Sequence, residues 1–373
     1  MTRAQSIAVI GAGQIGRVIA DMLARSGHKI TLADQAPIRA RATLHPGIVP
    51  AQVDATDDAA LRRLLGGQDI VVSACPYFLN KGIAAAAAAT GTHYFDLTED
   101  VATTAFIRDL AKDASVALMP QCGLAPGFIC VLGADMATHF ETAHSIRMRV
   151  GALPRFPTNA LGYNITWSVD GLINEYCNPC EIVQDGLPIL APPLEGLETV
   201  MIDGVAYEAF HTSGGLGTLT ETLAGRVRDM SYQTLRYPGH AEIMKLLLRG
   251  LGLAGDRATL RNILTHAAPF TADDTVIIFV TGIGARDGLL QEESLVLRYD
   301  GTEGQSAIQM TTASGLVAMI ELFLAGRLPQ RGFIRQEDAS LADMLATTAG
   351  QRLAAALPAG QRARLADKPS LAA

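Results

Sequence analysis

A glycine-rich hexapeptide, Gly11-Ala12-Gly13-Gln14-Ile15-Gly16, follows the apolar run Ser6–Ile10 and opens the stretch Gly16–Ser26, whose pattern is typical of a helix. After a strand, the first glycine permits a tight turn and the second lets the backbone approach a pyrophosphate. The third lets helix and strand pack closely, and the helix N-terminus adds N–H groups and partial positive charge. The loop therefore predicts a dinucleotide site that contains Gly11, Gly13, Gln14, Ile15 and Gly16.

Two aspartates at later strand ends bear on which dinucleotide binds. Asp34 lies eighteen residues after the last loop glycine, at the end of the second predicted strand. A carboxylate there accepts hydrogen bonds from the adenosine ribose and repels a 2′-phosphate, so NAD is favoured over NADP. Arg39 and Arg41 leave some room for NADP. Asp54, at the end of the third strand, either bonds the adenine amine or forms a turn.

The fourth predicted strand contributes the rest of the predicted cofactor site. The carboxyl ends of parallel strands meet at one edge of the sheet, where ligands bind. We therefore expect Ser73, Ala74 and Cys75 to line the site, with Tyr77 close behind them. Tyr77 and Cys122, which each follow a strand at this edge, line the nicotinamide pocket either as functional groups or as packing alone.

Asp96 ends the fifth predicted strand, His93–Leu97, at the same edge. A carboxylate there can hold an ammonium or orient a catalytic water. The alternative is that Asp96 caps the next helix, although Thr98 is the better capping residue by its position.

Four residues beyond Arg147 are candidates for handling an amino acid. Arg236 can hold a carboxylate in a bidentate fork, or it is a surface arginine on a strand. His240, just past a Pro-Gly turn, has an ordinary pKa near neutrality and can accept an ammonium proton or bond the carboxylate; otherwise it stabilises the turn. Asp170 and Asn174, one helical turn apart, present a carboxylate and an amide to the substrate, or form a solvated helix face.

The elements that position these residues alternate between short β-rich runs and helical stretches over residues 1–130. Continuously apolar strands joined by helices predict an α/β, Rossmann-type, doubly wound parallel sheet. After Arg147 the strands are typical of antiparallel pairs, which predicts a second α+β domain, mainly an antiparallel sheet, over residues 131–310 for substrate binding and dimerisation. Thr312–Gly326 is expected to be an amphipathic helix ended by Gly326. The helices of residues 311–373 are expected to pack back on the first domain.

Composition excludes several function classes. The 373 residues are 49% hydrophobic and 18% charged, which predicts two or three globular domains with a sizeable core. The net charge is −7 and there is no basic run, so neither nucleic acid nor an anionic membrane is an expected partner. Apolar stretches shorter than a membrane span, and an N-terminus without room for a signal sequence, predict a cytoplasmic protein.

Five cysteines do not suggest a disulfide framework. Cys177 and Cys180 have the spacing of a redox dithiol or a zinc knuckle, but no second pair completes four ligands. No metal site is therefore expected.

Beyond these separate motifs, the chain resembles the saccharopine dehydrogenase superfamily, and within it the lysine 6-dehydrogenases. The resemblance is carried by the glycine loop and by four further stretches. These are His93-Tyr94-Phe95-Asp96, Gly123-Leu124-Ala125-Pro126-Gly127, Gly171-Leu172-Ile173-Asn174-Glu175-Tyr176 with Asn178-Pro179, and Thr234-Leu235-Arg236-Tyr237-Pro238-Gly239-His240. Saccharopine reductases usually carry Asp where this sequence has Ala125, which moves the resemblance away from saccharopine.

The resemblance implies an NAD-dependent amino-acid dehydrogenase that oxidises the ε-amine of L-lysine. The products would be ammonia and 2-aminoadipate 6-semialdehyde, which cyclises to a piperideine carboxylate. His240, Asp96 and Tyr77 are then the expected catalytic residues, and Arg236, Asp170, Asn174 and Cys122 the expected substrate contacts. A homodimer is expected, as is common in this superfamily. Two alternatives stay open: a saccharopine or opine-type dehydrogenase, whose pocket would bring together Arg147, Arg149, Arg155 and Arg236, and a protein that binds NAD without catalysis.

Overall fold

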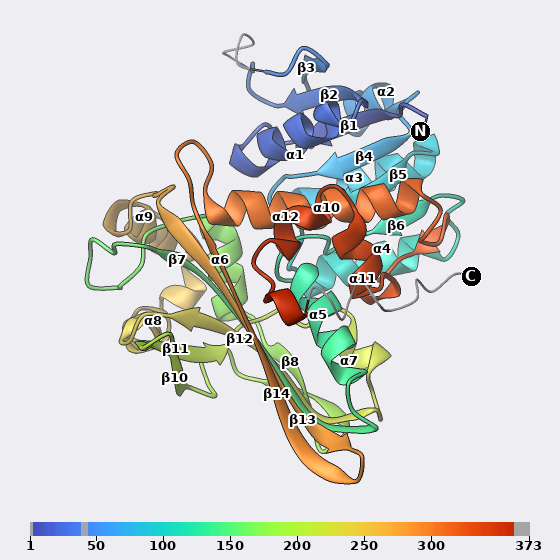
Figure 1. The fold of residues 1–373 in the computed structure, drawn as a ribbon. Coiled ribbons are helices and arrows are strands. Elements are labelled where there is room, and N and C mark those ends of the chain that lie inside the picture. The colour runs from blue at the N-terminus through green and yellow to red at the C-terminus, as the bar shows by residue number, and fades with distance from the viewer. Residues whose placement is uncertain (1–2, 39–43, 362–373) are drawn as a thin grey trace. The chain divides into compact units, whose positions relative to one another are not determined.

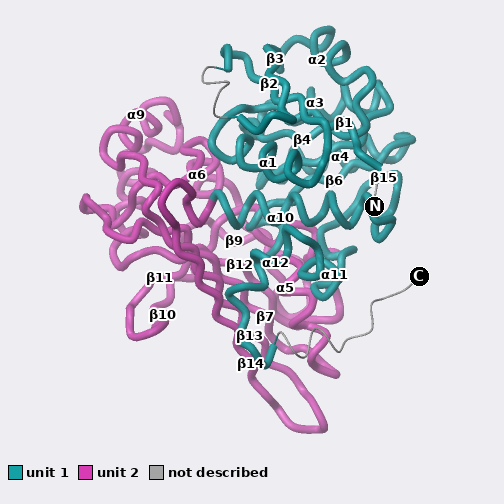
Figure 2. Tube along the Cα trace, turned by 45° about the horizontal axis from the view of Figure 1, so that its top comes forward, with its two compact units in different colours: residues 1–128, 309–373 teal, residues 129–308 magenta. Residues whose placement is uncertain are grey.

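The computed structural model describes residues 3–38 and 44–361, and it divides into two compact units (Figure 2). Unit 1 comprises residues 1–128 and 309–373, and unit 2 comprises residues 129–308. Arg39 and Arg41, the arginines that leave room for NADP, lie outside the described residues.

Unit 1 is built on a seven-stranded sheet in which every pair of neighbours is parallel. The sheet order is β15-β6-β5-β4-β1-β2-β3. From β1 the strands are added outward through β2 to β3, and β4 then pairs with the other side of β1, so the order of strand addition reverses there. This arrangement confirms the predicted doubly wound sheet. The strands are β1 (Ser6–Ile10), β2 (Lys29–Asp34), β3 (Ile48–Gln52), β4 (Ile70–Ser73), β5 (His93–Asp96), β6 (Ala117–Met119) and β15 (Gly332–Phe333).

The helices of unit 1 follow the strands in the alternation that the sequence predicts (Figure 1). Asp100 caps α4 by accepting the Thr103 N–H at 2.7 Å. The alternative that Asp96, or better Thr98, caps this helix is therefore wrong, because the helix begins only at Val101. The helices are α1 (Gln14–Arg25), α2 (Asp58–Leu65), α3 (Tyr77–Thr90), α4 (Val101–Ala111), η4 (Gln336–Asp338), α11 (Leu341–Ala346) and α12 (Gly350–Ala354).

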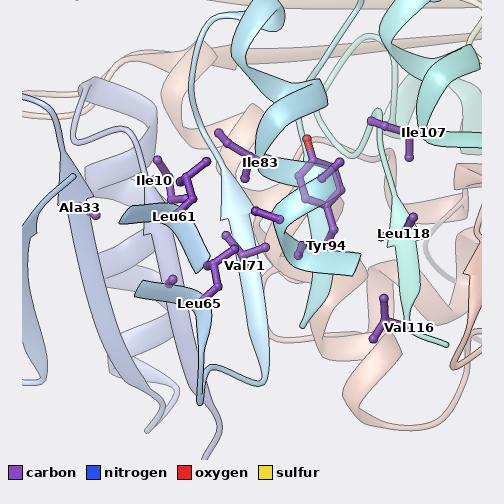
Figure 3. Packing of buried hydrophobic residues seen from close by; sticks show 14 of the residues in the cluster. Ile10, Ala33, Leu61, Leu65, Val71, Ile83, Tyr94, Ile107, Val116 and Leu118 are labelled. Atoms are coloured by element: carbon purple, nitrogen blue, oxygen red, sulfur yellow. The ribbon is translucent and has the colours of Figure 1, made fainter. Parts of the chain in front are cut away.

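One face of this sheet and helices α2, α3 and α4 enclose a buried apolar cluster (Figure 3). Val71 on β4 and Leu118 on β6 are fully buried there, as are Leu65 and Ile83 on the covering helices. Strands buried on both faces have no reason to alternate polar and apolar residues, which explains the continuously apolar runs in the sequence.

Unit 2 is built on an eight-stranded mixed sheet, whose main order is β10-β11-β12-β7-β13-β14. Its pairs are antiparallel except for β12 and β7, which run parallel. The predicted second α+β unit with a mainly antiparallel sheet is therefore confirmed. The strands are β7 (Thr142–Pro154), β8 (Cys180–Gln184), β9 (Leu187–Ala191), β10 (Glu198–Ile202), β11 (Val205–His211), β12 (Val227–Arg236), β13 (Asp274–Arg286) and β14 (Leu289–Asp300).

The long β13–β14 hairpin closes through a two-residue turn. Asp287 and Gly288 both have positive φ angles, 53° and 73°. This turn geometry matches the twist of the flanking strands and favours an Asp-Gly pair. The Asp-Gly pair thus joins two long strands, of 13 and 12 residues.

Short helices accompany the sheet of unit 2. They are α6 (Val169–Cys177), α7 (Leu219–Thr222), α8 (His240–Lys245), η2 (Leu246–Gly250), η3 (Leu253–Gly255) and α9 (Arg257–Ala267). The helix α5 (Phe128–Ala137) begins at the last residue of the first segment of unit 1 and continues into unit 2.

The helix α10 (Ala307–Leu324) differs from the amphipathic helix expected over Thr312–Gly326. Among the described helices it alone is long and apolar enough to cross a membrane, and 83% of it is buried inside the protein. A helix that is apolar all round belongs in a core. The expectation of one apolar face is therefore wrong, because this helix is covered on most of its surface.

The Asp274 carboxylate holds the first turn of α10. It is fully buried and accepts the N–H groups of Ala307 at 2.6 Å and Ile308 at 3.0 Å. A side chain from another element thereby satisfies helix donors that have no partner within the helix.

We expect Asp274→Ala to lower the free energy of unfolding by about 1–3 kcal/mol, because two buried N–H groups lose their acceptor. Urea unfolding measures this loss. The neighbouring Asp273→Ala is the control: its ion pair with Arg155 is 3.6 Å long and exposed, so its effect should stay below about 1 kcal/mol. Equal effects of the two substitutions would contradict the capping role.

Candidate functional site

The three loop glycines of unit 1 have distinct surroundings. Gly11 has a φ of +101°, and a Cβ there would lie 2.6 Å from the Ala74 carbonyl oxygen. A Cβ on Gly16 would collide with the Gly11 carbonyl, whereas a Cβ on Gly13 would meet nothing within 4 Å. Gly11 and Gly16 are therefore required by packing within the fold, and Gly13 leaves open space where a pyrophosphate would approach.

The N-terminus of α1 opens onto this space. Gly13 is its N-cap and offers no side chain to the first N–H groups of the helix, so these groups remain suited to an anion. Gln14 is exposed and accepts a hydrogen bond from the Gln309 amide at 2.8 Å, within unit 1, while Ile15 is half-buried. The residues present fit the diphosphate of a dinucleotide.

Asp34 lies beside the loop, as predicted. One carboxylate oxygen accepts the Ala12 N–H at 2.7 Å, and the other accepts the Ala36 N–H at 3.0 Å. A carboxylate has about four acceptor positions, so two remain for ribose hydroxyls. Asp54 instead accepts both the N–H and the hydroxyl of Thr56, which lowers its pKa. The turn is the role that this geometry supports for Asp54.

The three residues after the fourth strand have different environments. Ser73 is buried and donates to the Asn80 side-chain oxygen at 2.7 Å. Ala74 packs its backbone against Gly11. The Cys75 thiol donates to the Ile10 carbonyl at 3.4 Å, and burial raises its pKa to about 12. Of the three, Ala74 is the one that shapes the glycine loop.

Asp96 is fully buried, and its carboxylate is surrounded by donors. One oxygen accepts the N–H groups of Thr98 and Gln121, both at 2.9 Å. The other accepts the Tyr94 hydroxyl at 2.7 Å and the Asn80 amide at 3.4 Å. Burial raises its pKa to about 6 despite these bonds. All four acceptor positions are used, so in this conformation Asp96 holds the strand-end loops and has none left for an ammonium.

Of the other two candidates of unit 1, Cys122 serves packing here. The Cys122 thiol is 1% exposed and donates to the Met119 carbonyl at 3.2 Å, and burial raises its pKa well above the ordinary value. The predicted substrate contact at Cys122 is therefore not supported by this geometry. Tyr77 begins α3 half-buried, with its ring edge-on to Phe78 at 5.6 Å.

In unit 2, Arg236 and His240 are joined through Tyr176, a residue that the sequence reasoning did not single out. The Arg236 Nε–H donates to the Tyr176 hydroxyl at 3.0 Å, and that hydroxyl lies 3.1 Å from His240 Nε2. The three side chains are at most 2% exposed. The Arg236 guanidinium also lies over the Tyr163 ring, 4.7 Å from its centre. The alternative of a surface arginine is therefore wrong.

His240 is unsuited to the role of general base. Its Nδ1 lies 2.9 Å from the Leu161 carbonyl, which can only accept, so this nitrogen carries the proton. Burial and the nearby Arg236 charge lower its pKa to about 3. Such a weak base does not take a proton from an ammonium near neutral pH. The prediction of a proton-accepting His240 is therefore not supported, and the ring serves instead to hold Tyr176.

Glu208, also missed from the sequence, fixes the turn that carries His240. Its buried carboxylate accepts the N–H groups of Gly239 at 2.9 Å and of Ala241. Glu208 on β11 is also the cross-strand partner of Arg236 on β12. The Pro-Gly turn was the available signal for a fixed backbone here, but nothing local indicates which carboxylate fixes it.

Asp170 and Asn174 contact α9. Asp170 pairs with Arg261 at 3.2 Å, and the Asn174 oxygen lies 3.4 Å from Arg257. Asn174 also accepts the Asn178 amide at 2.8 Å. The two residues share one face of α6, as predicted, but that face packs on another helix. Their predicted role as substrate contacts is therefore not supported.

Comparison with known proteins agrees with this arrangement. A family model described as the saccharopine dehydrogenase NADP binding domain matches residues 7–121, and one described as the saccharopine dehydrogenase C-terminal domain matches residues 123–354. Among solved structures, the apo saccharopine dehydrogenase (L-Glu forming) from Saccharomyces cerevisiae aligns with a TM-score of 0.75 at 18% identity. The alignment covers 91% of this chain and 95% of that chain, which shows the shared fold.

Two curated relatives are saccharopine dehydrogenases (NADP+, L-glutamate-forming). That of Pyricularia oryzae is 23% identical over 309 residues, and that of Saccharomyces cerevisiae is 27% identical over 275 residues. The alignments cover 76% and 68% of this chain, but only 65% and 59% of the relatives. The chain thus spans about three fifths of the length of these relatives.

We expect Gly13→Ala and Gly16→Ala to separate ligand binding from folding. Gly13→Ala should leave the thermal midpoint within a few degrees of wild type but weaken dinucleotide binding at least 10-fold, because the methyl group occupies the space over the loop. Gly16→Ala should lower the midpoint itself, because its Cβ would collide with Gly11. Thermal unfolding and NADH titration measure the two effects, and the reverse pattern would contradict the assigned roles.

Proposed function

The chain belongs to the saccharopine dehydrogenase family, and from that premise we propose that it is an NAD-dependent amino-acid dehydrogenase acting on the ε-amine of L-lysine. The proposed reaction converts L-lysine, NAD⁺ and water into 2-aminoadipate 6-semialdehyde, NADH, ammonium and a proton. When bound, the nicotinamide would supply the hydride acceptor. The observation that carries the choice of substrate is the isolation of Arg236 among the candidate arginines of unit 2.

Arg147 and Arg149 lie on the face of the sheet opposite to Arg236. Arg149 on β7 is paired in register with Gln233 on β12, and paired residues point to the same side of a sheet. Arg236 is three residues beyond Gln233, so it points to the other side.

The other arginines are also already partnered. Arg149 and Arg147 contact Glu198 at 2.7 Å and 3.5 Å, and Arg155 contacts Asp273 at 3.6 Å. The convergence of four arginines that the saccharopine alternative required does not occur in unit 2. One guanidinium in aromatic surroundings suits a substrate with one carboxylate, such as lysine, better than one with several.

The choice of NAD rests on Asp34. Its carboxylate is held next to the glycine loop by Ala12 and Ala36, and it would repel a 2′-phosphate there. The matched family model and the curated relatives carry NADP in their descriptions. We propose that this chain differs from those relatives in cofactor preference because of this carboxylate.

The proton of the substrate ammonium has no acceptor in His240, so we propose that solvent removes it. Hydride can leave the carbon only when the amine is neutral, and an ordinary lysine amine has a pKa of about 10.4. The rate should therefore rise about 10-fold per pH unit below that pKa.

We expect purified protein to form NADH with NAD and L-lysine at alkaline pH, with one ammonia released per NADH. Activity with saccharopine should be at least 10-fold lower, and NADP should replace NAD poorly. Absorbance of NADH over a panel of L-lysine, L-ornithine, D-lysine and saccharopine measures this.

Turnover of saccharopine with release of glutamate would favour the alternative substrate and contradict the argument from one arginine. Binding of NAD without turnover of any amine would favour a protein that binds the dinucleotide without catalysis.

A further inference from the structure

The hydroxyl of Tyr176 lies between Arg236 and the buried His240 and contacts both side chains. It contacts Arg236 at 3.0 Å and His240 at 3.1 Å. We propose that Tyr176 is a positioning residue that holds the Arg236 guanidinium in the orientation that receives the α-carboxylate of the substrate. This inference rests on the proposed function and adds to it the residue that sets the strength and selectivity of the carboxylate contact.

Four groups form a chain of hydrogen bonds: the Leu161 carbonyl, His240, Tyr176 and Arg236. Which group donates in each bond follows from the Leu161 carbonyl at one end. The Leu161 carbonyl can only accept, so His240 Nδ1 donates to it at 2.9 Å. A neutral imidazole then has its other nitrogen, Nε2, as an acceptor, so the Tyr176 O–H donates to it. The tyrosine oxygen consequently offers its lone pairs to the Arg236 Nε–H. The Leu161 carbonyl thus determines that Tyr176 acts as the hydrogen-bond acceptor for Arg236.

The same chain of hydrogen bonds determines which N–H donors of Arg236 can bind a carboxylate. A guanidinium has five N–H donors. The Nε–H is bound to Tyr176 and one Nη1–H is bound to the Leu235 carbonyl at 2.9 Å. The Tyr163 ring at 4.7 Å restrains the guanidinium plane. Three N–H donors remain, one on Nη1 and two on Nη2, and one from each nitrogen can bind the two oxygens of a carboxylate in an end-on fork.

The elements that hold Tyr176 and His240 are anchored independently of the hydroxyl. Helix α6 is tied to α9 by the Asp170–Arg261 ion pair. Helix α8 is tied to β11 by Glu208, which binds the Gly239 N–H at 2.9 Å. The Tyr176 ring itself packs edge-on against Phe210 with 5.7 Å between centres. Phenylalanine retains this ring packing, so Tyr176→Phe should fold.

The test compares Tyr176→Phe with wild type on two amines, L-lysine and pentane-1,5-diamine, which lacks the carboxylate. The variant should raise KM for L-lysine about 10- to 100-fold, since a hydrogen bond to a buried charge is lost. We expect kcat to stay within about threefold and KM for NAD to be unchanged. With pentane-1,5-diamine the variant and wild type should be alike, so the preference for L-lysine falls by the same factor as the KM change.

Tyr207→Phe is the matched control, because Tyr207 is another buried tyrosine of unit 2 and lies outside the chain of hydrogen bonds. It should leave both amines unaffected. An equal loss on both amines in Tyr176→Phe would show a merely structural role, and no loss on either would show that Arg236 does not need the hydroxyl. Both results would overturn the proposal.

A spectroscopic measurement tests the chain without turnover. Nitrogen-15 NMR of the eight histidines, with His240 assigned by the loss of its signals in His240→Asn, should show a proton on Nδ1 and none on Nε2 at neutral pH. In Tyr176→Phe the Nε2 signal should shift toward that of an unbonded nitrogen. A protonated Nε2 in wild type would overturn the proposal. Absence of turnover with every amine would instead refute the proposed function. The NMR measurement would then still test the hydrogen bonds of His240 and Tyr176.

Discussion

The burial of the Arg236 charge constrains the architecture of unit 2. A guanidinium that is 2% exposed loses several kcal/mol of hydration, and only well-placed partners recover it. Those partners come from separate segments: Tyr163 before α6, Tyr176 and the charge of Glu175 on α6, and the backbone of β12 itself. Strand, helix and loop must therefore be in place together before this residue is tolerated. Three of its five N–H donors take no part in the bonds to Tyr176 and Leu235, and under the proposed function these donors suit a ligand of opposite charge.

In unit 1 the main constraint is the close approach of backbone atoms around the glycine loop. Gly11 and Gly16 bring strand, loop and helix into contacts that leave no room for a Cβ, and Ala74 lies within the same packing. Asp34 then fixes the Ala12 N–H and, with it, the course of the loop. The two units thus divide the chemistry between them. Under the proposed function, one provides a rigid backbone surface for a dinucleotide, and the other provides a restrained cation for an amino acid.

The sequence predicted the arrangement of residues that interact within one continuous segment. The glycine loop, the strand before it and the carboxylate at Asp34 lie in one continuous unit, so their spacing predicted their arrangement. Arg236 and His240 are also close in sequence, and both contact Tyr176. The role of His240 was not foreseen, because its proton position depends on the Leu161 carbonyl, 79 residues away, and its low pKa depends on burial and on the Arg236 charge. The contacts of Asp170 and Asn174 with α9 were not foreseen, because the amphipathic pattern of α6 does not reveal which element packs on that face.

The most direct test of the account is a crystal structure of the protein with NADH and L-lysine. The account predicts that the α-carboxylate lies on the Nη1 and Nη2 atoms of Arg236, with Tyr176 still bound to Nε and His240 still bound to the Leu161 carbonyl. A substrate carboxylate held elsewhere, with Arg236 retaining only its contacts within the protein, would contradict it.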